Sequence, residues 1–169
     1  MRLTGKQIIE KGIVTNYSEE AVQQQGIDVR VWNIWEVGAD GTSGLVPAHG
    51  KTMIPRTRPV YWLSNGMVTL EPGYYEIEFM EACEIPADCV LHYDTRSSLI
   101  RCGSQVRSGQ FDGGFKTPNM GAYLKVELPI TLERESRLAQ AVVDETYTVS
   151  EDDLYNGQFQ NDSQRANSN

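Results

Sequence analysis

The sequence predicts a mostly β domain, a sandwich or barrel that is preceded by short helical segments at the N-terminus. Two observations lead to this fold class. Short runs rich in Val, Ile and Tyr recur at a spacing of about ten residues, and turn signals such as "SNG", "EPG" and "FDGGFKTPN" separate them. The chain of 169 residues is long enough for one domain with a core. We therefore expect a single domain over residues 1–160 and a disordered polar tail over residues 161–169.

The start of the chain predicts two short helical segments. Residues 3–12 read "LTGKQIIEKG", in which Thr4 can cap a helix and Gly12 can end it. Residues 18–26 read "SEEAVQQQG" and predict a further helical turn that ends at Gly26. The rest of the chain carries little helix signal.

After the second helical segment, the sequence pattern becomes typical of β-strands. Residues 27–37, "IDVRVWNIWEV", alternate in part and are rich in Val, Ile and Trp, as strands are. Residues 38–52 combine glycines with small polar side chains, which predicts a loop. Further strands are expected in the runs "PVYWLS", "MVTLEP", "YYEIEFM", "CVLHYDT", "AYLKVELPITLE" and "RLAQAVVDETYTV".

The composition argues against several classes of function. The net charge of −8 and the pI of about 4.8 speak against nucleic-acid binding, which needs a basic surface. No apolar run approaches the roughly 20 residues of a membrane helix, and the N-terminus lacks the apolar core of a secretory signal. We therefore expect a cytoplasmic protein with neither nucleic-acid nor membrane partners.

The cysteines and histidines form no recognisable metal or disulfide pattern. Cys83 and Cys89 are six residues apart, whereas the cysteine pairs of structural zinc sites are about two to four residues apart. Cys102 makes the number of cysteines odd, and only His49 and His92 could complete a zinc site. We expect neither zinc nor disulfides, and we expect Cys102 to be buried.

The stretch "DTRSSLIRCG" concentrates cationic and hydroxyl side chains in an acidic chain. Arg96, Ser97, Ser98 and Arg101 supply the guanidinium and hydroxyl donors that bind phosphate. A strand leads into this stretch, so a helix or tight turn can begin there with Ser97 or Ser98 as its N-cap. From the residues alone, the alternative is a polar turn in which Arg96 pairs with Asp94 and the serines only cap the backbone.

The order of these segments resembles the dCTP deaminase branch of the trimeric dUTPase superfamily. The resemblance rests on "GIDVRV", "LEPGYYEIEFMEACEIPADCVLHYDTRSSLIRCG", "SGQFDGGF", "LKVELPITLERESRLAQAVV" and "LYNGQFQ", which occur in the family's order over most of the chain. It implies a distorted jelly-roll-like β-barrel, a homotrimer, and active sites between subunits.

The resemblance implies catalytic roles for three residues. Ser97 and Arg101 would contact the phosphates and the catalytic centre, and Arg96 and Ser98 would bind the substrate beside them. Glu127, in "LKVELP", would take a proton from the water that attacks C4 of cytosine and would then help ammonia to leave. From the strand pattern alone, a solvent-facing carboxylate is the alternative for Glu127.

A second group of residues is expected to bind the nucleoside. Ser108 and Gln110 lie in a hairpin arm that would read the pyrimidine edge, and Phe115 would lie below the sugar. Asp112 would reach the deoxyribose 3′-hydroxyl, or would orient the attacking water if the enzyme is a dUTPase. The residues alone allow a simpler role for Asp112, as the start of an Asx turn in "DGG".

The segment "LYNGQFQ" resembles the family's C-terminal lid. Tyr155 and Gln158 would touch phosphate, and a disordered segment is the alternative. Leu154 departs from the family, which usually has lysine there, and "DGGF" replaces the more common "DPGF" or "DAGF". The chain also lacks the Gly-rich C-terminal arm that is typical of dUTPases.

The function expected from the resemblance is zinc-independent deamination of dCTP to dUTP and ammonia, with Mg²⁺ bound through the triphosphate. The zinc deaminase signature, H-x-E with P-C-x-x-C, does not occur in the chain. One alternative is a dUTP diphosphatase, or a bifunctional enzyme, that gives dUMP and pyrophosphate. The other is a member of the fold that binds nucleotide without catalysis.

Overall fold

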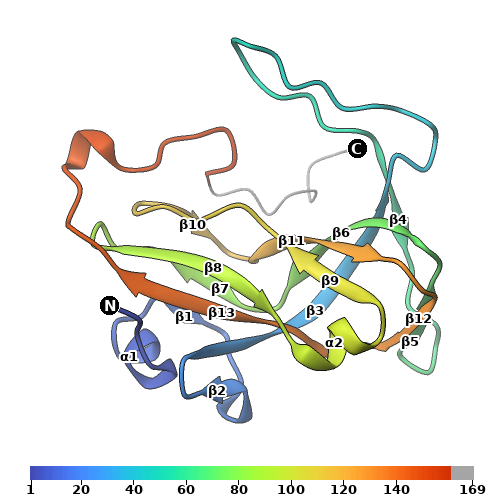
Figure 1. Cartoon of the computed structure of the whole chain (residues 1–169), viewed down its shortest axis with the longest axis horizontal. Helices are drawn as coiled ribbons and strands as arrows, with labels where there is room; N and C mark the ends of the chain where they lie inside the picture. The colour runs from blue at the N-terminus through green and yellow to red at the C-terminus, as the bar shows by residue number, and fades with distance from the viewer. Residues whose placement is uncertain (161–169) are drawn as a thin grey trace.

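The computed structural model describes residues 1–160, and its centre is one antiparallel sheet that curves into a barrel (Figure 1). Within that range, six strands follow one another in the order β8-β13-β3-β6-β11-β9. Their bounds are β3 (Gly26–Val37), β6 (Gly73–Phe79), β8 (Cys89–Thr95), β9 (Ser104–Arg107), β11 (Gly121–Val126) and β13 (Arg137–Glu145). Two short strands, β2 (Val22–Gln23) and β4 (Thr57–Val60), also pair with β3. The predicted mostly β class is confirmed.

Two smaller sheets complete the described strands. One joins β1 (Val14–Thr15), β7 (Ala82–Glu84) and β10 (Lys116–Thr117), and the other joins β5 (Met67–Leu70) to β12 (Ile130–Glu133). The sequence predictions missed β1, β2, β7, β9 and β10, because each has at most four residues and leaves almost no periodic pattern. The run "AYLKVELPITLE" was expected as one strand, but it divides into β11 and β12 around Glu127–Pro129.

The side chain of Thr95 links the two edge strands of the sheet, β8 and β9. Its hydroxyl donates to the carbonyl oxygen of Val106 at 2.9 Å and accepts from the amide of Val106 at 3.0 Å. Both backbone groups would otherwise belong to an open sheet edge. The barrel is therefore closed at this point by one threonine.

The helices are short and lie at the ends of strands. α1 (Gly5–Glu10) begins with a capping box, in which the Thr4 hydroxyl accepts from the amide of Gln7 and the Gln7 side chain accepts from the amide of Thr4. The predicted turn at 18–26 is a 3₁₀ turn, η1 (Glu19–Ala21), followed by β2, and a second one is η2 (Glu151–Asp153).

α2 (Ser97–Arg101) begins one or two residues earlier than predicted, because its N-cap is Arg96 rather than Ser97 or Ser98. No helix within residues 1–160 has the length and apolar character that a membrane crossing requires. The three cysteines are free, and Cys102 is exposed rather than buried as expected, since it follows the exposed face of α2.

In β11, strict alternation places the core and the exterior on opposite faces of the strand. Along β11, Ala122, Leu124 and Val126 are buried, while the residues between them are partly exposed. Residues 38–56 leave this frame and project from the barrel as a long arm between β3 and β4 (Figure 1). The predicted loop is therefore confirmed and is four residues longer than expected.

Candidate functional site

A pocket of about 240 Å³ lies beside the loop that follows β9. One wall comes from that loop, a second from β11, and a third from the C-terminal segment. The lining residues are Ser108, Gly109, Gln110, Phe111, Asp112, Phe115, Gly121, Ala122, Tyr123, Tyr155 and Phe159. The structure thus brings together five of the residues that the sequence predicted to bind the nucleoside or close over it.

The loop after β9 is held in place by backbone hydrogen bonds to two neighbouring segments. Phe111 and Leu91 exchange two such bonds, at 2.8 and 3.0 Å, which pins the loop to β8. The amide of Gly114 donates to the carbonyl oxygen of Ile85 at 2.8 Å. Because both contacts use the backbone, the side chains around the "FDGGF" turn are left to line the pocket.

Aromatic rings form a continuous series from the core to the pocket. The ring centroids are 5.3 Å apart for Phe79 and Tyr93, 5.5 Å for Tyr93 and Phe111, and 5.0 Å for Phe111 and Phe115. Tyr155 continues the series in an edge-to-face contact, with its ring centroid 5.4 Å from that of Phe115. Burial raises the pKa of Tyr93 well above its usual value, so this ring stays neutral. The series gives the pocket rigid apolar walls that suit a flat ring.

Asp112 is the one carboxylate among the described residues of the pocket lining, which include no lysine or arginine. Its side chain is exposed and accepts a hydrogen bond of 2.8 Å from the Gln110 side-chain amide. A pocket with this lining suits a neutral heterocycle and a sugar hydroxyl. It does not supply the positive charge that a triphosphate needs.

The C-terminal segment packs against the pocket of its own chain. The amide of Tyr155 donates to the carbonyl oxygen of Gly113 at 2.8 Å, and Gln160 donates to that of Gly114 at 2.7 Å. Gly114 has φ +90°, and a Cβ there would lie 2.9 Å from the Cβ of Leu154. Glycine at this position therefore permits the close approach of the segment.

The two predicted lid residues have different positions. Tyr155 lines the pocket, whereas the Gln158 side chain is exposed and donates to the carbonyl oxygen of Thr52 in the 38–56 arm at 3.2 Å. The phosphate contacts expected of both residues stay predictions.

The remaining predicted residues lie at the opposite end of β9. Ser97, Ser98 and Arg101 are exposed on α2, which is anchored by the buried side chain of Leu99. The four residues of β9 separate this end from the pocket loop, a length of roughly 13 Å at about 3.3 Å per residue. Within the described lining of the pocket there is no residue of α2.

Glu127 lies beside the turn that follows α2. It is the first residue after β11, its side chain is exposed, and its amide donates to the carbonyl oxygen of Gly103 at 2.9 Å. The register pairs Val126 with Ser104, whereas the pocket residue Tyr123 pairs with Arg107. Glu127 therefore groups with α2 and not with the pocket of its own chain, and its catalytic role stays a prediction.

Arg96 pairs with an acid that the sequence analysis did not consider. Its Nε is 3.3 Å from an oxygen of Asp28, and Nη1 donates to the carbonyl oxygen of Arg137 at 3.1 Å. The alternative that Arg96 pairs with Asp94 named the wrong partner, because Asp94 lies beside Arg2 and His92.

Sequence reasoning missed three aromatic residues of the pocket lining, Phe111, Tyr123 and Phe159. Tyr123 stacks on Tyr74 with centroids 5.1 Å apart, so one side of its ring is covered. An aromatic residue two positions after Gly121, on the same face of a predicted strand, was a signal that could have indicated it. No comparable signal existed for Phe159, because its position depends on the path of the C-terminal segment.

The fold and the pocket define a β-barrel protein with a pocket that is lined by aromatic rings. A family model described as dCTP deaminase-like matches residues 3–146, and the chain belongs to that family. This agrees with the resemblance found in the sequence to the dUTPase and dCTP deaminase superfamily.

Curated relatives are named as dUTP nucleotidohydrolases rather than as dCTP deaminases. The chain is 32% identical over 145 residues to a probable deoxyuridine 5′-triphosphate nucleotidohydrolase of Aeropyrum pernix. This alignment covers 85% of this chain and 87% of the relative. It is 30% identical over 134 residues to the deoxyuridine 5′-triphosphate nucleotidohydrolase of Methanocaldococcus jannaschii. That alignment covers 78% of this chain and 83% of the relative.

A solved structure shares the fold. The 2′-deoxycytidine 5′-triphosphate deaminase of Agrobacterium tumefaciens superposes with a TM-score of 0.60 at 19% identity. The match covers 84% of this chain but 47% of that longer chain. At this identity, the likeness concerns the fold alone.

Proposed function

We propose that the protein hydrolyses dUTP to dUMP and pyrophosphate. The observation that carries the proposal is the pocket with aromatic walls and the single carboxylate Asp112 among its described lining residues. Its volume of about 240 Å³ is below the roughly 300–1,000 Å³ of drug-sized sites, which suits a nucleoside but not a whole triphosphate. The names of the relatives at 30% identity and above support the choice of dUTP.

In the proposed reaction, Asp112 orients a water molecule toward the α-phosphorus. The water oxygen forms a bond to phosphorus as the bond to the pyrophosphate oxygen breaks, and the proton of the water passes to the carboxylate and then to solvent. The exposed position of Asp112 allows this exchange, and Gln110 holds one of its oxygens so that the other can face the water.

We further propose that each site is assembled from two copies of the chain, within a homotrimer. One copy supplies the pocket for the nucleoside, and α2 of another supplies Ser97, Ser98 and Arg101 for the phosphates. This proposal is supported by the separation of the two kinds of binding group within one chain. The described lining of the pocket has no cation, and the exposed donors of α2 lie at the other end of β9.

Mg²⁺ enters this proposal with the substrate. Within residues 1–160, no three His, Cys, Asp or Glu side chains gather to hold a metal ion. The oxygens of a triphosphate are the hard ligands that Mg²⁺ prefers, and the ion would offset part of their charge. The chain's own contribution is then the donors of α2.

Deamination of dCTP is the second candidate. The description of the matching family favours it, as does the position of Glu127 beside α2, where it could face the base held by another copy. A bifunctional enzyme would carry dCTP on to dUMP.

One assay separates these functions. The protein is incubated with Mg²⁺ and either dCTP or dUTP, and the products are resolved by ion-exchange chromatography. We expect dUMP and pyrophosphate from dUTP. Accumulation of dUTP from dCTP would instead establish the deaminase, dUMP from both substrates the bifunctional enzyme, and binding without turnover a non-catalytic member of the fold.

Complementation tests the assembly from two copies. Arg101→Ala removes a phosphate donor and Asp112→Asn removes the water-orienting carboxylate, so each variant alone is expected to be inactive. Co-expressed chains would form mixed oligomers in which some sites receive an intact pocket and an intact α2, and activity would partly return. If all site residues came from one chain, no mixed oligomer would recover activity.

A further inference from the structure

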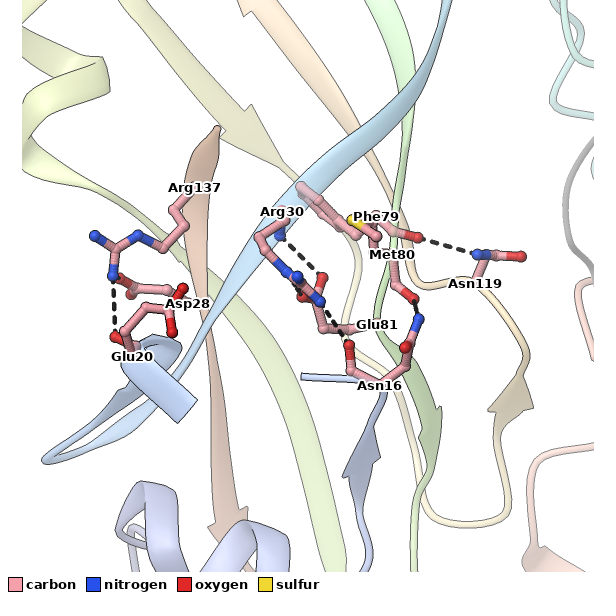
Figure 2. A network of polar contacts seen from close by, with 9 residues as sticks. All are labelled: Asn16, Glu20, Asp28, Arg30, Phe79, Met80, Glu81, Asn119 and Arg137. Atoms are coloured by element: carbon pink, nitrogen blue, oxygen red, sulfur yellow. Dashed lines mark hydrogen bonds and ion pairs between the residues drawn. The ribbon is translucent and has the colours of Figure 1, made fainter. Parts of the chain in front are cut away.

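Asp28 of β3 is a buried carboxylate between two arginines. Its side chain is 4% exposed, and its Oδ2 lies 3.3 Å from Nε of Arg96 and 3.5 Å from Nη1 of Arg137. The other oxygen accepts a hydrogen bond of 3.4 Å from Gln140. Figure 2 shows Arg137 reaching from β13 to Asp28 and to the carbonyl oxygen of Glu20. A carboxylate this deeply buried is tolerated because cations and a donor surround it.

This cluster is joined to the start of α2. Arg96 is the N-cap of the helix, and its amide donates to the carbonyl oxygen of Leu138 at 3.2 Å. Its guanidinium donates at the same time to the carbonyl oxygen of Arg137 at 3.1 Å and faces Asp28. The first turn of α2 is therefore fastened to β13 and β3 by the backbone and the side chain of one residue.

α2 needs this support because of its length. It has five residues, and helices shorter than about 12 residues are marginal in water on their own. Its orientation therefore depends on the buried Leu99 and on the Arg96 contacts. Within residues 1–160, Ser97, Ser98 and Arg101 have no side-chain hydrogen bond or ion pair, which leaves their donors available for a ligand.

We propose that Arg96 and Asp28 are positioning residues for α2, and that Arg96 serves the phosphates through the helix rather than by direct contact. The proposal rests on the proposed function, in which α2 holds the triphosphate. It reassigns Arg96, which the sequence predicted to bind substrate directly. Asp28 acts by holding the guanidinium that fixes the first turn.

Ligands with and without phosphates test the role. Asp28→Asn, Arg96→Lys and the double variant are compared with the wild type for turnover of dUTP and dCTP, and for inhibition by 2′-deoxyuridine and 2′-deoxycytidine. We expect each single variant to lower kcat/KM about tenfold or more, because a small misplacement of binding groups costs that much. The inhibition constants of the nucleosides should not change, since the pocket lies at the other end of β9.

The double variant tests whether the two residues act as one unit. If Asp28 acts only by holding Arg96, the double variant should be no worse than the poorer single variant, because the two losses are not additive. Losses that multiply would overturn the proposal and would indicate that Arg96 contacts phosphate by itself.

Glu81→Gln is a matched control for the loss of a buried carboxylate. Glu81 lies between β6 and β7, is fully buried, and pairs at 2.7 Å with Arg30, which is on β3 two residues after Asp28 (Figure 2). We expect it to lower the melting temperature without changing the ratio of triphosphate to nucleoside affinity. If it changes that ratio as Asp28→Asn does, the effect is general to the barrel and the proposal fails.

A second pair of variants keeps the test decisive if Asp28→Asn does not fold. Arg96→Lys keeps a cation near any phosphate but cannot supply Nε and Nη1 to two acceptors at once, whereas Arg96→Gln removes the charge. A positioning role predicts that both are impaired alike, and a direct phosphate contact predicts that lysine restores most activity. If the wild-type protein neither binds nor turns over either triphosphate, the proposed function itself is wrong and this inference falls with it.

Discussion

The two ends of β9 differ in almost every chemical property. At the pocket end, aromatic rings and backbone contacts surround a small cavity, and the described lining contains one carboxylate and no cation. At the α2 end, hydroxyl and guanidinium groups are exposed on a five-residue helix, whose N-cap Arg96 pairs with the buried Asp28. The first end can bind a flat neutral ring, and the second can bind a polyanion. Under the proposed function, these two ends are the two halves of a nucleotide site, which one chain carries without joining them.

The largest effect that we expect is on chemistry at the pocket end. Asp112→Asn keeps the size of the side chain and a hydrogen-bond acceptor for Gln110, but it cannot take a proton from water. We predict a fall in kcat of about 10²–10³, within the roughly 10²–10⁴ that general acid–base catalysis contributes, with KM changed less than about threefold. Steady-state kinetics with dUTP measures this, and a variant with normal kcat would remove Asp112 from the reaction.

The second prediction concerns how the C-terminal segment contacts the pocket. Gly114→Ala adds a Cβ at φ +90° that would lie 2.9 Å from Leu154, so the segment must move. We predict a loss of stability of about 1–3 kcal/mol from the strained backbone and a KM raised about tenfold. Chemical denaturation and kinetics measure the two effects.

Gly66→Ala is the control for Gly114→Ala. It shares a positive φ of +78°, but its Cβ would meet nothing within 4 Å. We expect it to lose similar stability and to keep the KM of the wild type. An equal rise in KM in both variants would show that the contact with Leu154 has no part in substrate binding.

The third prediction tests the side-chain hydrogen bonds that join β8 to β9. Thr95→Val keeps the shape of the side chain but removes the hydroxyl that bonds to the amide and carbonyl of Val106. We predict a loss of about 1–3 kcal/mol in the free energy of unfolding, the cost of leaving buried polar groups without partners. If the loss is below about 0.5 kcal/mol, β8 and β9 are held together by packing and not by this hydroxyl.

The smallest effect is a pH dependence beside the pocket end, where the carbonyl oxygen of Glu81 accepts from the amide of Met120. Burial raises the pKa of Glu81, and the Arg30 guanidinium opposes this only in part. The folded state therefore binds a proton more tightly than the unfolded state. Ionised Glu81 lowers the stability of the wild type as the pH rises from below its unfolded-state pKa to above its folded-state pKa.

Glu81→Gln removes this titration and provides the test. We predict that the stability difference between the two proteins shifts in favour of Glu81→Gln as the pH rises through that window. Urea denaturation at pH values from about 4 to 7 measures the difference. A shift in the opposite direction would show that Arg30 outweighs burial.

The sequence predicted the elements that follow from local pattern. The alternation in "IDVRVWNIWEV" gave β3, Thr4 gave the start of α1, and the "FDGGF" turn gave the pocket loop. It failed where the pattern is too short to read, as in β7 and β10. It also placed Glu127 inside a continuous strand, whereas β11 ends at Val126. The reason is that an alternating pattern does not show where strand pairing stops.

By itself, the sequence determined the mostly β fold class, the family, and five of the residues that line the pocket, because these depend on periodicity and on motifs in order along the chain. Only the tertiary structure decided which of those residues meet. It placed Asp112 with Tyr155 and Glu127 with α2, and it paired Arg96 with Asp28, 68 residues away, instead of Asp94. The reason is physical: local pattern depends on neighbours in the chain, whereas ion pairs and pockets depend on strand order and register.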